Sequence, residues 1–224
     1  MPNPAVTSPP ASTSDLSALR MGFLMFPDFE ELDLVGPWEI ATMWQAYAGG
    51  PQCVTVAEQR AEIRCAKGLR VLPEHDFASV GALDYLLVPG GFSAFDEAKN
   101  PQTLAFVRAV AARSRAMLSV CSGSFILQAA GLLDGRRATS HWKALDSLRA
   151  LGVEVVEQRY VQDGALWTSA GVSAGIDMML AFVADQAGEA AACTTQLNAE
   201  YYPDPRRYGS PQTHPQAPAY LRHG

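Results

Sequence analysis

The architecture follows from one segment, Ala116-Met117-Leu118-Ser119-Val120-Cys121-Ser122-Gly123-Ser124-Phe125-Ile126-Leu127. Residues 116–120 form an apolar run that predicts a buried strand, and residues 124–130 have helical composition. Only a few residues connect the two, so the chain must turn sharply at Cys121. The unpaired N–H groups and the positive dipole at the start of the helix would favour a thiolate there. At this point a buried structural cysteine is the equally weighted alternative.

The segments on either side alternate between strands and helices. Apolar or alternating runs predict strands at residues 21–26, 52–57, 85–88, 137–139, 153–156 and 166–169, and a hairpin at residues 62–71. Helices are predicted to begin near Gly36-Pro37, at Asn100-Pro101, after His141-Trp142 and at residues 171–175. Asp163-Gly164 is expected to form the turn between the last two strands. This alternation is typical of an α/β fold, a three-layer sandwich whose mostly parallel sheet carries helices on both faces.

Length and composition fit one globular domain. The chain has 224 residues, of which 48% are hydrophobic and 18% charged, with a formal net charge of -6. The acidic balance argues against nucleic-acid binding, and no apolar run is long enough to span a membrane. We expect a disordered leader over residues 1–19, an α/β domain over residues 20–201 and an extended, proline-rich tail over residues 202–224.

The cysteines carry no disulfide or zinc pattern. Cys53, Cys65, Cys121 and Cys193 are scattered and include no C-x-x-C pair. The leader lacks the basic start and continuous apolar segment of a signal peptide. We therefore expect a cytoplasmic protein with reduced thiols and no metal.

Three loops follow strands whose carboxyl ends should lie at one edge of the sheet. Asp33 follows the first strand, Gly90-Gly91 follows a central strand, and Cys121 follows the strand at the sharp turn. Ligands of such sheets bind outside these strand ends. If the loops meet, Cys121 would attack an electrophilic carbon and Asp33 would donate and accept protons. The Ser122 hydroxyl would position water or substrate, and the N–H groups of Gly91 and Ser122 would stabilise an anion.

Each residue also has a structural interpretation. Asp33 and Ser122 could cap helices, and Gly90-Gly91 could be only a turn. Asp28, Glu30 and Glu31 are interpreted as a solvated loop face, and His141 as a structural histidine, with a catalytic role as its alternative. An ionised Asp33 beside Cys121 would raise the pKa of the thiol, so we expect the two groups to share one proton.

These residues resemble the ThiJ/PfpI superfamily, which shares the fold of class I glutamine amidotransferase domains. The similarity covers about residues 20–210. Its motifs are Phe26-Pro27, Leu32-Asp33-Leu34-Val35-Gly36-Pro37, Val88-Pro89-Gly90-Gly91, Val120-Cys121-Ser122-Gly123-Ser124, residues 129–142 and Ser173-Ala174-Gly175-Ile176-Asp177. Within the superfamily the chain is most similar to the isonitrile hydratases, which convert an isocyanide and water to an N-substituted formamide. The resemblance implies a flavodoxin-like fold, a homodimer, and no metal or organic cofactor.

The resemblance also implies roles for individual residues. Isonitrile hydratases carry Asp at the position of Asp33, where many members have Glu, and their turn reads Cys-Thr-Gly-Ser, so Ser122 is a departure. By analogy, Cys121 attacks the terminal isocyanide carbon while Asp33 protonates it, and the same carboxyl then activates water. Phe92, Phe95, Trp142 and Trp167 are candidates to line a pocket for an apolar substituent, and at least half of them are expected to have a packing role instead.

A sensing function is the main alternative. Regulators of the AraC type often begin with a nearly identical domain that binds a ligand without catalysis. No helix-turn-helix follows residue 224, so a complete regulator is not expected. The alternative is therefore a separate ligand sensor or a thiol-oxidation sensor that uses Cys121. A glyoxalase-type member is a further alternative, although those members tend toward Glu in place of Asp33. The presence of Asp33 beside Cys121 distinguishes an enzyme from a sensor, because catalysis requires this pair and ligand sensing does not.

Overall fold

A seven-stranded sheet forms the centre of the molecule, in the order β10-β11-β7-β6-β1-β2-β5. The structure is a computed structural model that describes residues 15–206 and 208–222. The strands of the sheet are β1 (Arg20–Leu24), β2 (Gln52–Ala57), β5 (His75–Asp76), β6 (Tyr85–Val88), β7 (Ala116–Val120), β10 (Tyr160–Asp163) and β11 (Leu166–Ser169). All neighbouring pairs are parallel except β10 and β11.

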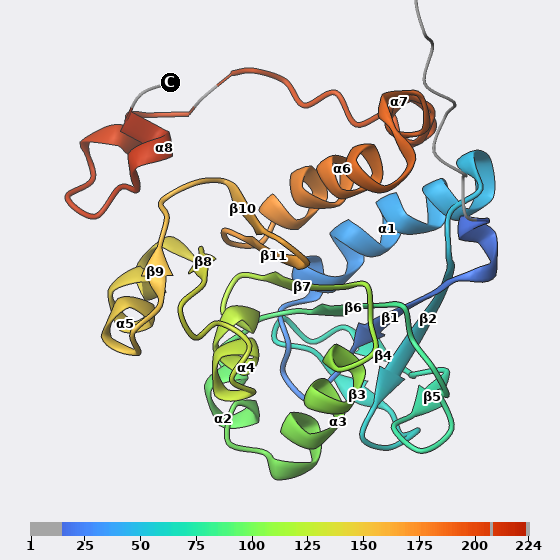
Figure 1. Cartoon of the computed structure of the whole chain (residues 1–224). Helices are drawn as coiled ribbons and strands as arrows, with labels where there is room; N and C mark the ends of the chain where they lie inside the picture. Colours follow the sequence, from blue (N-terminus) through green and yellow to red (C-terminus); the bar gives the residue numbers. More distant parts are fainter. Residues whose placement is uncertain (1–14, 207, 223–224) are drawn as a thin grey trace, which may run out of the picture.

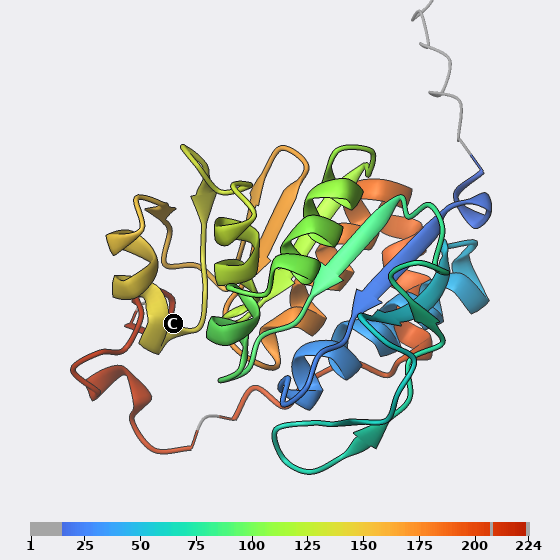
Figure 2. The ribbon, with the colours of Figure 1, turned by 90° about the horizontal axis from the view of Figure 1, so that it is seen from below.

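Helices cover both faces of this sheet. One face carries α1 (Glu31–Ala48), α6 (Ala174–Ala187) and α7 (Glu189–Asn198), as Figure 1 shows. The other face carries α2 (Ala94–Glu97), α3 (Pro101–Ala111) and α4 (Gly123–Ala129), which lie across the strands in Figure 2. Every residue of β6 and β7 is buried, as expected for parallel strands covered on both sides. The predicted three-layer α/β sandwich is confirmed.

Smaller elements lie around the sheet. The predicted hairpin is present as β3 (Ile63–Arg64) and β4 (Arg70–Val71), which pair antiparallel. Beyond α4, β8 (Arg137–Ala138) pairs parallel with β9 (Glu154–Val155), and α5 (Leu145–Ala150) lies between them in the chain. No described helix has the length and apolar character needed to cross a bilayer.

The first helix begins earlier than predicted. Proline suits a first turn, which placed the expected start near Gly36-Pro37, whereas α1 begins at Glu31 and contains Pro37. Glu31 and Asp33 occupy the first turn, where negative groups are favoured by the positive end of the helix. Asp33 is therefore a residue of the first turn of α1, and not a loop residue or a helix cap.

The region after β9 also differs from the prediction. The strand predicted at residues 153–156 pairs with β8, and a further strand, β10, forms the antiparallel partner of β11. Asp163-Gly164 turns between β10 and β11. The strand β10 was not predicted, because only one of its four residues is buried and its apolar pattern is weak. The polar helix α7 (Glu189–Asn198) was missed for the same reason.

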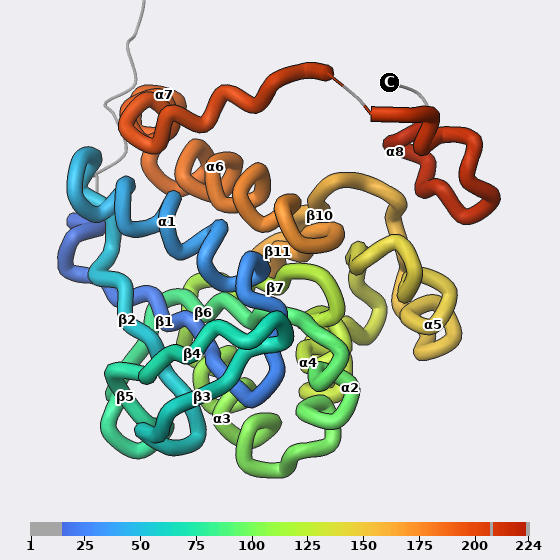
Figure 3. The backbone as a smooth tube through the Cα atoms, turned by 180° about the vertical axis from the view of Figure 1, so that it is seen from behind, coloured from blue at the N-terminus to red at the C-terminus, as the bar shows by residue number. Residues whose placement is uncertain are grey.

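Short helices are present in the described parts of both chain ends. The predicted leader lies mostly outside the described residues, but its last part forms a short 3-10 helix (Leu16–Ala18) capped by Asp15. The tail beyond α7 runs to the other side of the molecule and ends in a 3-10 helix (Pro211–Thr213) and α8 (Ala219–Arg222) (Figure 3). The N–H of Ala219 donates to Glu157 at 2.9 Å, so the tail is attached beside β9.

Candidate active site

Cys121 occupies the turn between β7 and α4. Its φ angle is 57°, in the left-handed region that residues with a side chain rarely adopt. The Cys121 N–H donates to the carbonyls of Ser169 and Ala170 at 3.2 and 3.1 Å. The Cys121 carbonyl accepts from the hydroxyls of Ser124 and Ser140 at 3.2 and 2.9 Å. The predicted sharp turn is confirmed, and four hydrogen bonds hold its strained backbone in place.

The three predicted loops meet at the carboxyl edge of the sheet. A Cβ atom added to Gly90 would lie 2.5 Å from the Ser122 nitrogen and 2.9 Å from Asp33 Oδ2. One added to Gly123 would lie 2.3 Å from the Val88 carbonyl oxygen. Glycine is thus needed at both positions for close packing. The meeting point lies beside the boundary between β1 and β6, where the direction of strand succession reverses.

Replacing Gly90 by alanine should push these loops apart. We expect a loss of about 1–3 kcal/mol of unfolding free energy from overpacking, together with faster reaction of Cys121 with a thiol reagent. Urea unfolding and labelling rates measure the two effects, in a Cys193→Ser background that removes the exposed thiol. A Gly131→Ala control, at a strained turn with open space around it, should lose stability but leave Cys121 labelling unchanged. Equal labelling of Cys121 in both variants would show that Gly90 does not hold the site together.

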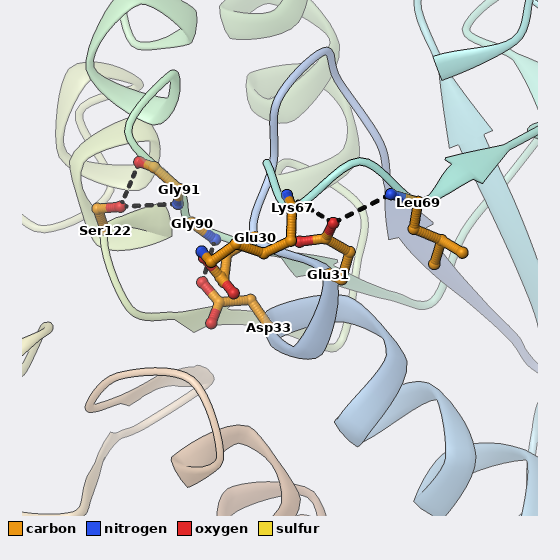
Figure 4. A network of polar contacts seen from close by, with 8 residues as sticks. All are labelled: Glu30, Glu31, Asp33, Lys67, Leu69, Gly90, Gly91 and Ser122. Carbon is orange, nitrogen blue, oxygen red and sulfur yellow. Dashed lines mark hydrogen bonds and ion pairs between the residues drawn. The ribbon is translucent and has the colours of Figure 1, made fainter. Parts of the chain in front are cut away.

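The Asp33 carboxyl is fully buried at the base of the site. Its Oδ2 accepts from the Gly90 N–H at 2.9 Å, and its Oδ1 has no partner in regular hydrogen-bond geometry (Figure 4). The pKa of Asp33 is raised to about 7, because burial and, to a smaller extent, the charge of Glu30 outweigh the opposing effects of the Gly90 N–H, the Cys121 thiol and the Val172 N–H. Asp33 is therefore divided between its acid and carboxylate forms near neutral pH.

Cys121 is a thiol rather than a free thiolate in this environment. Burial raises its pKa to about 12, and the neighbouring Asp33 charge contributes to the increase. The N–H and hydroxyl of Ser122 and the N–H of Val172 act in the opposite direction without overcoming burial. The stabilising effect expected from the helix start is present but is not dominant. The first proton to leave the pair comes from Asp33, which leaves a carboxylate adjacent to the thiol.

The Gly91 N–H, one of the two predicted anion-binding groups, is hydrogen-bonded to Ser122. The Gly91 N–H donates to Ser122 Oγ at 3.0 Å, and that hydroxyl donates to the Gly91 carbonyl at 2.8 Å. Gly91 is thereby engaged with Ser122 and not directed at the sulfur. The N–H groups that act on Cys121 belong to Ser122 and Val172. Val172 precedes α6 with a φ of 52°, and its only sequence signal is the adjacent Gly171.

Of the acidic residues interpreted as a solvated loop face, Asp28 is exposed in a turn as predicted, whereas Glu30 and Glu31 are engaged by other parts of the chain. Glu30 forms an ion pair with Lys67 of the β3–β4 hairpin, and its side chain is 18% exposed. Glu31 Oε1 accepts from the backbone N–H groups of Lys67 and Leu69 at 2.7 and 3.4 Å. Figure 4 shows these contacts in one row next to Asp33. The hairpin is thus fastened to the start of α1, at the side of the site.

A cavity of about 410 Å³ opens above Cys121. Its lining consists of Glu30, Lys67, Gly91, Phe92, Phe95, Cys121, Ser122, His141, Lys143, Ala144, Ser147 and Val172. Phe92 and Phe95 line it as predicted. Trp167 does not, because it is buried in the core against Phe182, and Trp142 packs on His214 of the tail.

His141 lies closer to the site than its structural interpretation implied. Its ring lines the cavity and fills the space beside Gly171, where an added Cβ would lie 2.2 Å away. Nδ1 accepts from the Lys143 N–H at 3.2 Å, and burial and the Lys143 charge lower the pKa of the ring. His141 is thus neutral near pH 7, with Nε2 carrying the proton. Among the described residues, no cluster of three or more His, Cys, Asp or Glu side chains could hold a metal ion.

Known proteins resemble this chain in sequence and in structure. A sequence profile of the DJ-1/PfpI family matches residues 20–185. The isonitrile hydratase of Pseudomonas putida is 40% identical over 201 residues, 89% of this chain and 86% of that protein. The HTH-type transcriptional regulator CdhR of Pseudomonas aeruginosa is 29% identical over 74% of this chain, which spans 50% of the regulator. A solved ThiJ/PfpI family protein from Pseudomonas syringae has a TM-score of 0.82 and 35% identity, covering 99% of this chain and 90% of its own.

Proposed function

The chain belongs to the DJ-1/PfpI family, and from this premise we propose that it is a hydratase that adds water to isocyanides and releases N-substituted formamides. The observation that carries the proposal is the buried Asp33 carboxyl adjacent to the thiol of Cys121, which lines the cavity. Identity of 40% to the isonitrile hydratase of Pseudomonas putida over most of both chains supports the same reaction.

The first half of the proposed reaction forms a covalent thioimidate. The Asp33 carboxylate takes the proton of Cys121 as the sulfur attacks the terminal carbon of the isocyanide. A sulfur–carbon bond forms, and the electron pair left on that carbon takes the proton back from Asp33, which gives R–N=CH–S. A carboxyl with a pKa of about 7 suits both steps, because it accepts and releases a proton with little energy difference near neutral pH.

The second half hydrolyses this intermediate. Asp33 takes a proton from water as the oxygen adds to the thioimidate carbon, and then delivers that proton to the nitrogen. Breaking of the carbon–sulfur bond releases the formamide, and the hydroxyl proton returns to the sulfur. The N–H groups of Ser122 and Val172 stabilise the departing sulfur, while the Ser122 hydroxyl fixes the Gly91 loop. The net change is addition of one water molecule to one isocyanide.

Incubation with cyclohexyl or phenyl isocyanide tests the proposal directly. We expect stoichiometric formamide, detected by chromatography, and incorporation of one oxygen atom from ¹⁸O-labelled water. Quenching during turnover should trap a thioimidate adduct on the peptide that contains Cys121. Absence of formamide with a panel of alkyl and aryl isocyanides would reject the hydratase.

The pH dependence should respond in opposite directions to the two charges beside Asp33. Because the carboxylate form starts the reaction, we expect kcat/KM to fall below about pH 7. Glu30→Gln removes a charge that raises the Asp33 pKa, so this acidic limb should move to lower pH. Lys67 and the Asp33 charge stabilise each other, so Lys67→Met should move the limb to higher pH. Profiles of kcat/KM between pH 5 and 9 measure both shifts.

This pair of variants contains its own control. Both substitutions break the same Glu30–Lys67 ion pair, so a purely structural disturbance would move the two profiles in the same direction. Movement in the same direction, or no movement, would remove the charge effect from the proposal.

A ligand-sensing domain is the second candidate, favoured by the similarity to the regulator CdhR over 74% of this chain. A thiol-oxidation sensor is less well supported, because peroxides react with thiolates and burial raises the Cys121 pKa to about 12. Binding of isocyanides without any formamide product would favour sensing.

A further inference from the structure

The cavity above Cys121 has one strongly apolar wall. Phe92 is 87% exposed and Phe95 is 40% exposed, although both are large hydrophobic residues. The Phe95 ring packs on Phe125 with centroids 4.8 Å apart, so it is held in position at the cavity. Exposed aromatic rings at a cavity of this size suit the apolar body of a small ligand.

The charges that line the cavity leave one cation uncompensated. Glu30 and Lys67 neutralise each other as an ion pair. Lys143 makes no ion pair with any residue in the described part of the chain, and its Nζ lies 5.1 Å from the centroid of the Trp142 ring. Asp146, an acidic residue close to it in the chain, is engaged by Arg149 at 2.6 Å. The three charged residues that line the cavity, Glu30, Lys67 and Lys143, therefore carry a net charge of +1, although the whole chain carries a formal net charge of -6.

A hydroxyl accompanies this cation. Ser147 lines the same cavity and follows Lys143 by four positions, across the start of α5. A lysine ammonium and a serine hydroxyl are both hydrogen-bond donors, and together they suit a carboxylate. Cys121 lines this cavity too, so a molecule that reacts there can extend toward Lys143.

We infer that the preferred substrates are isocyanides with an apolar, aromatic-sized body and a carboxylate distant from the isocyanide, which Lys143 binds at the cavity. This inference rests on the proposed hydratase function and names its substrate class. Lys143 acts on binding and not on the reacting carbon, so its effect should fall on KM while kcat changes little.

The test compares 4-isocyanobenzoate with the nearly isosteric, neutral 4-isocyanobenzamide. We expect the native chain to favour the carboxylate in kcat/KM, and Lys143→Met to reduce the carboxylate-to-carboxamide ratio about five-fold, the effect of one partly exposed ion pair. Lys143→Glu should reverse the preference. Because the ratios are compared between variants, the intrinsic reactivities of the two isocyanides cancel. Higher salt should weaken the preference of the native chain.

An Arg113→Gln variant is the matched control. It makes the same change in net charge at an exposed residue near the start of β7, at the opposite end of the strand from Cys121, and should leave the ratio unchanged. A ratio that is equal in the native chain, Lys143→Met and Lys143→Glu would overturn the inference while hydration itself remained.

Failure of the hydratase proposal has a different signature. If neither isocyanide reacts, calorimetric binding of 4-formamidobenzoate and 4-formamidobenzamide to the same variants still tests Lys143. Tighter binding of the carboxylate that is lost in Lys143→Met would support the anion site without catalysis. Equal binding of both compounds to the native chain would overturn the anion site as well.

Discussion

Cys121→Ser should abolish hydration, with a loss of at least about 10⁴-fold in kcat. Serine is close in size and keeps the hydrogen bonds of the Cys121 backbone, so the fold should be preserved. Its hydroxyl is a far weaker nucleophile than sulfur, and the thioimidate cannot form on it. Initial rates of formamide formation and mass spectrometry of the quenched protein measure the two consequences.

The exposed Cys193 supplies the control for this substitution. Cys193→Ser changes a thiol on α7, outside the residues that line the cavity, and should retain the native rate. Activity of Cys121→Ser above a tenth of the native value would mean that hydration does not pass through the sulfur.

Asp33→Asn should lower kcat by about 10³-fold, because it removes the group that carries protons in both halves of the proposed reaction. The amide oxygen can still accept from the Gly90 N–H, so the site should keep its geometry. Asp134→Asn, at an exposed position outside the cavity lining, is the charge-matched control and should retain full activity. An active Asp33→Asn variant would remove this residue from the mechanism.

The same substitution should stabilise the fold, with a definite pH dependence. The Asp33 pKa is about 7 in the folded chain and 3.8 as the reference for an unfolded one, so the folded state loses stability as pH rises from about 4 to about 7. Asparagine carries no such cost. Asp33→Asn should therefore be more stable than the native chain by as much as about 4 kcal/mol above pH 7, and nearly equal to it at pH 4. Urea unfolding at pH 4 and pH 8 measures the difference, and an equal effect at both pH values would contradict the buried carboxyl.

The parts of the site that were predicted are those with a local sequence signal. A buried apolar strand that runs into a glycine-containing turn identifies both the Cys121 turn and the Gly90 loop, and parallel strands bring such turns to one edge. The meeting of these loops with Asp33 followed from that architecture. The start of α1 was not predicted correctly, because Pro37 suits the first turn of a helix. The carboxyl groups that favour the earlier start, at Glu31 and Asp33, look like part of a polar loop in the sequence.

The parts that were missed depend on the backbone or on long-range contacts. Val172 lowers the Cys121 pKa through its N–H group, which every residue except proline has, so nothing in its side chain signals this contribution. Glu30 is positioned by a lysine 37 residues away in the β3–β4 hairpin, and no local pattern reveals that pairing. Half of the four candidate aromatic residues, Trp142 and Trp167, pack elsewhere, as expected for at least half of them, but an aromatic residue looks alike in sequence whether it lines a cavity or fills the core, so the sequence did not show which two would do so.

The arrangement of β1, β6 and β7 has a consequence for how activity arises. These neighbouring strands present Asp33, Gly90 and Cys121, yet β1 and β6 pair residues as distant in the chain as Met21 and Tyr85. Such remote pairings form late and slowly, since a long loop must close first. Recovered turnover during refolding would therefore report completion of the central sheet, and a polypeptide cleaved between β2 and β6 would yield two inert fragments until they reassociated.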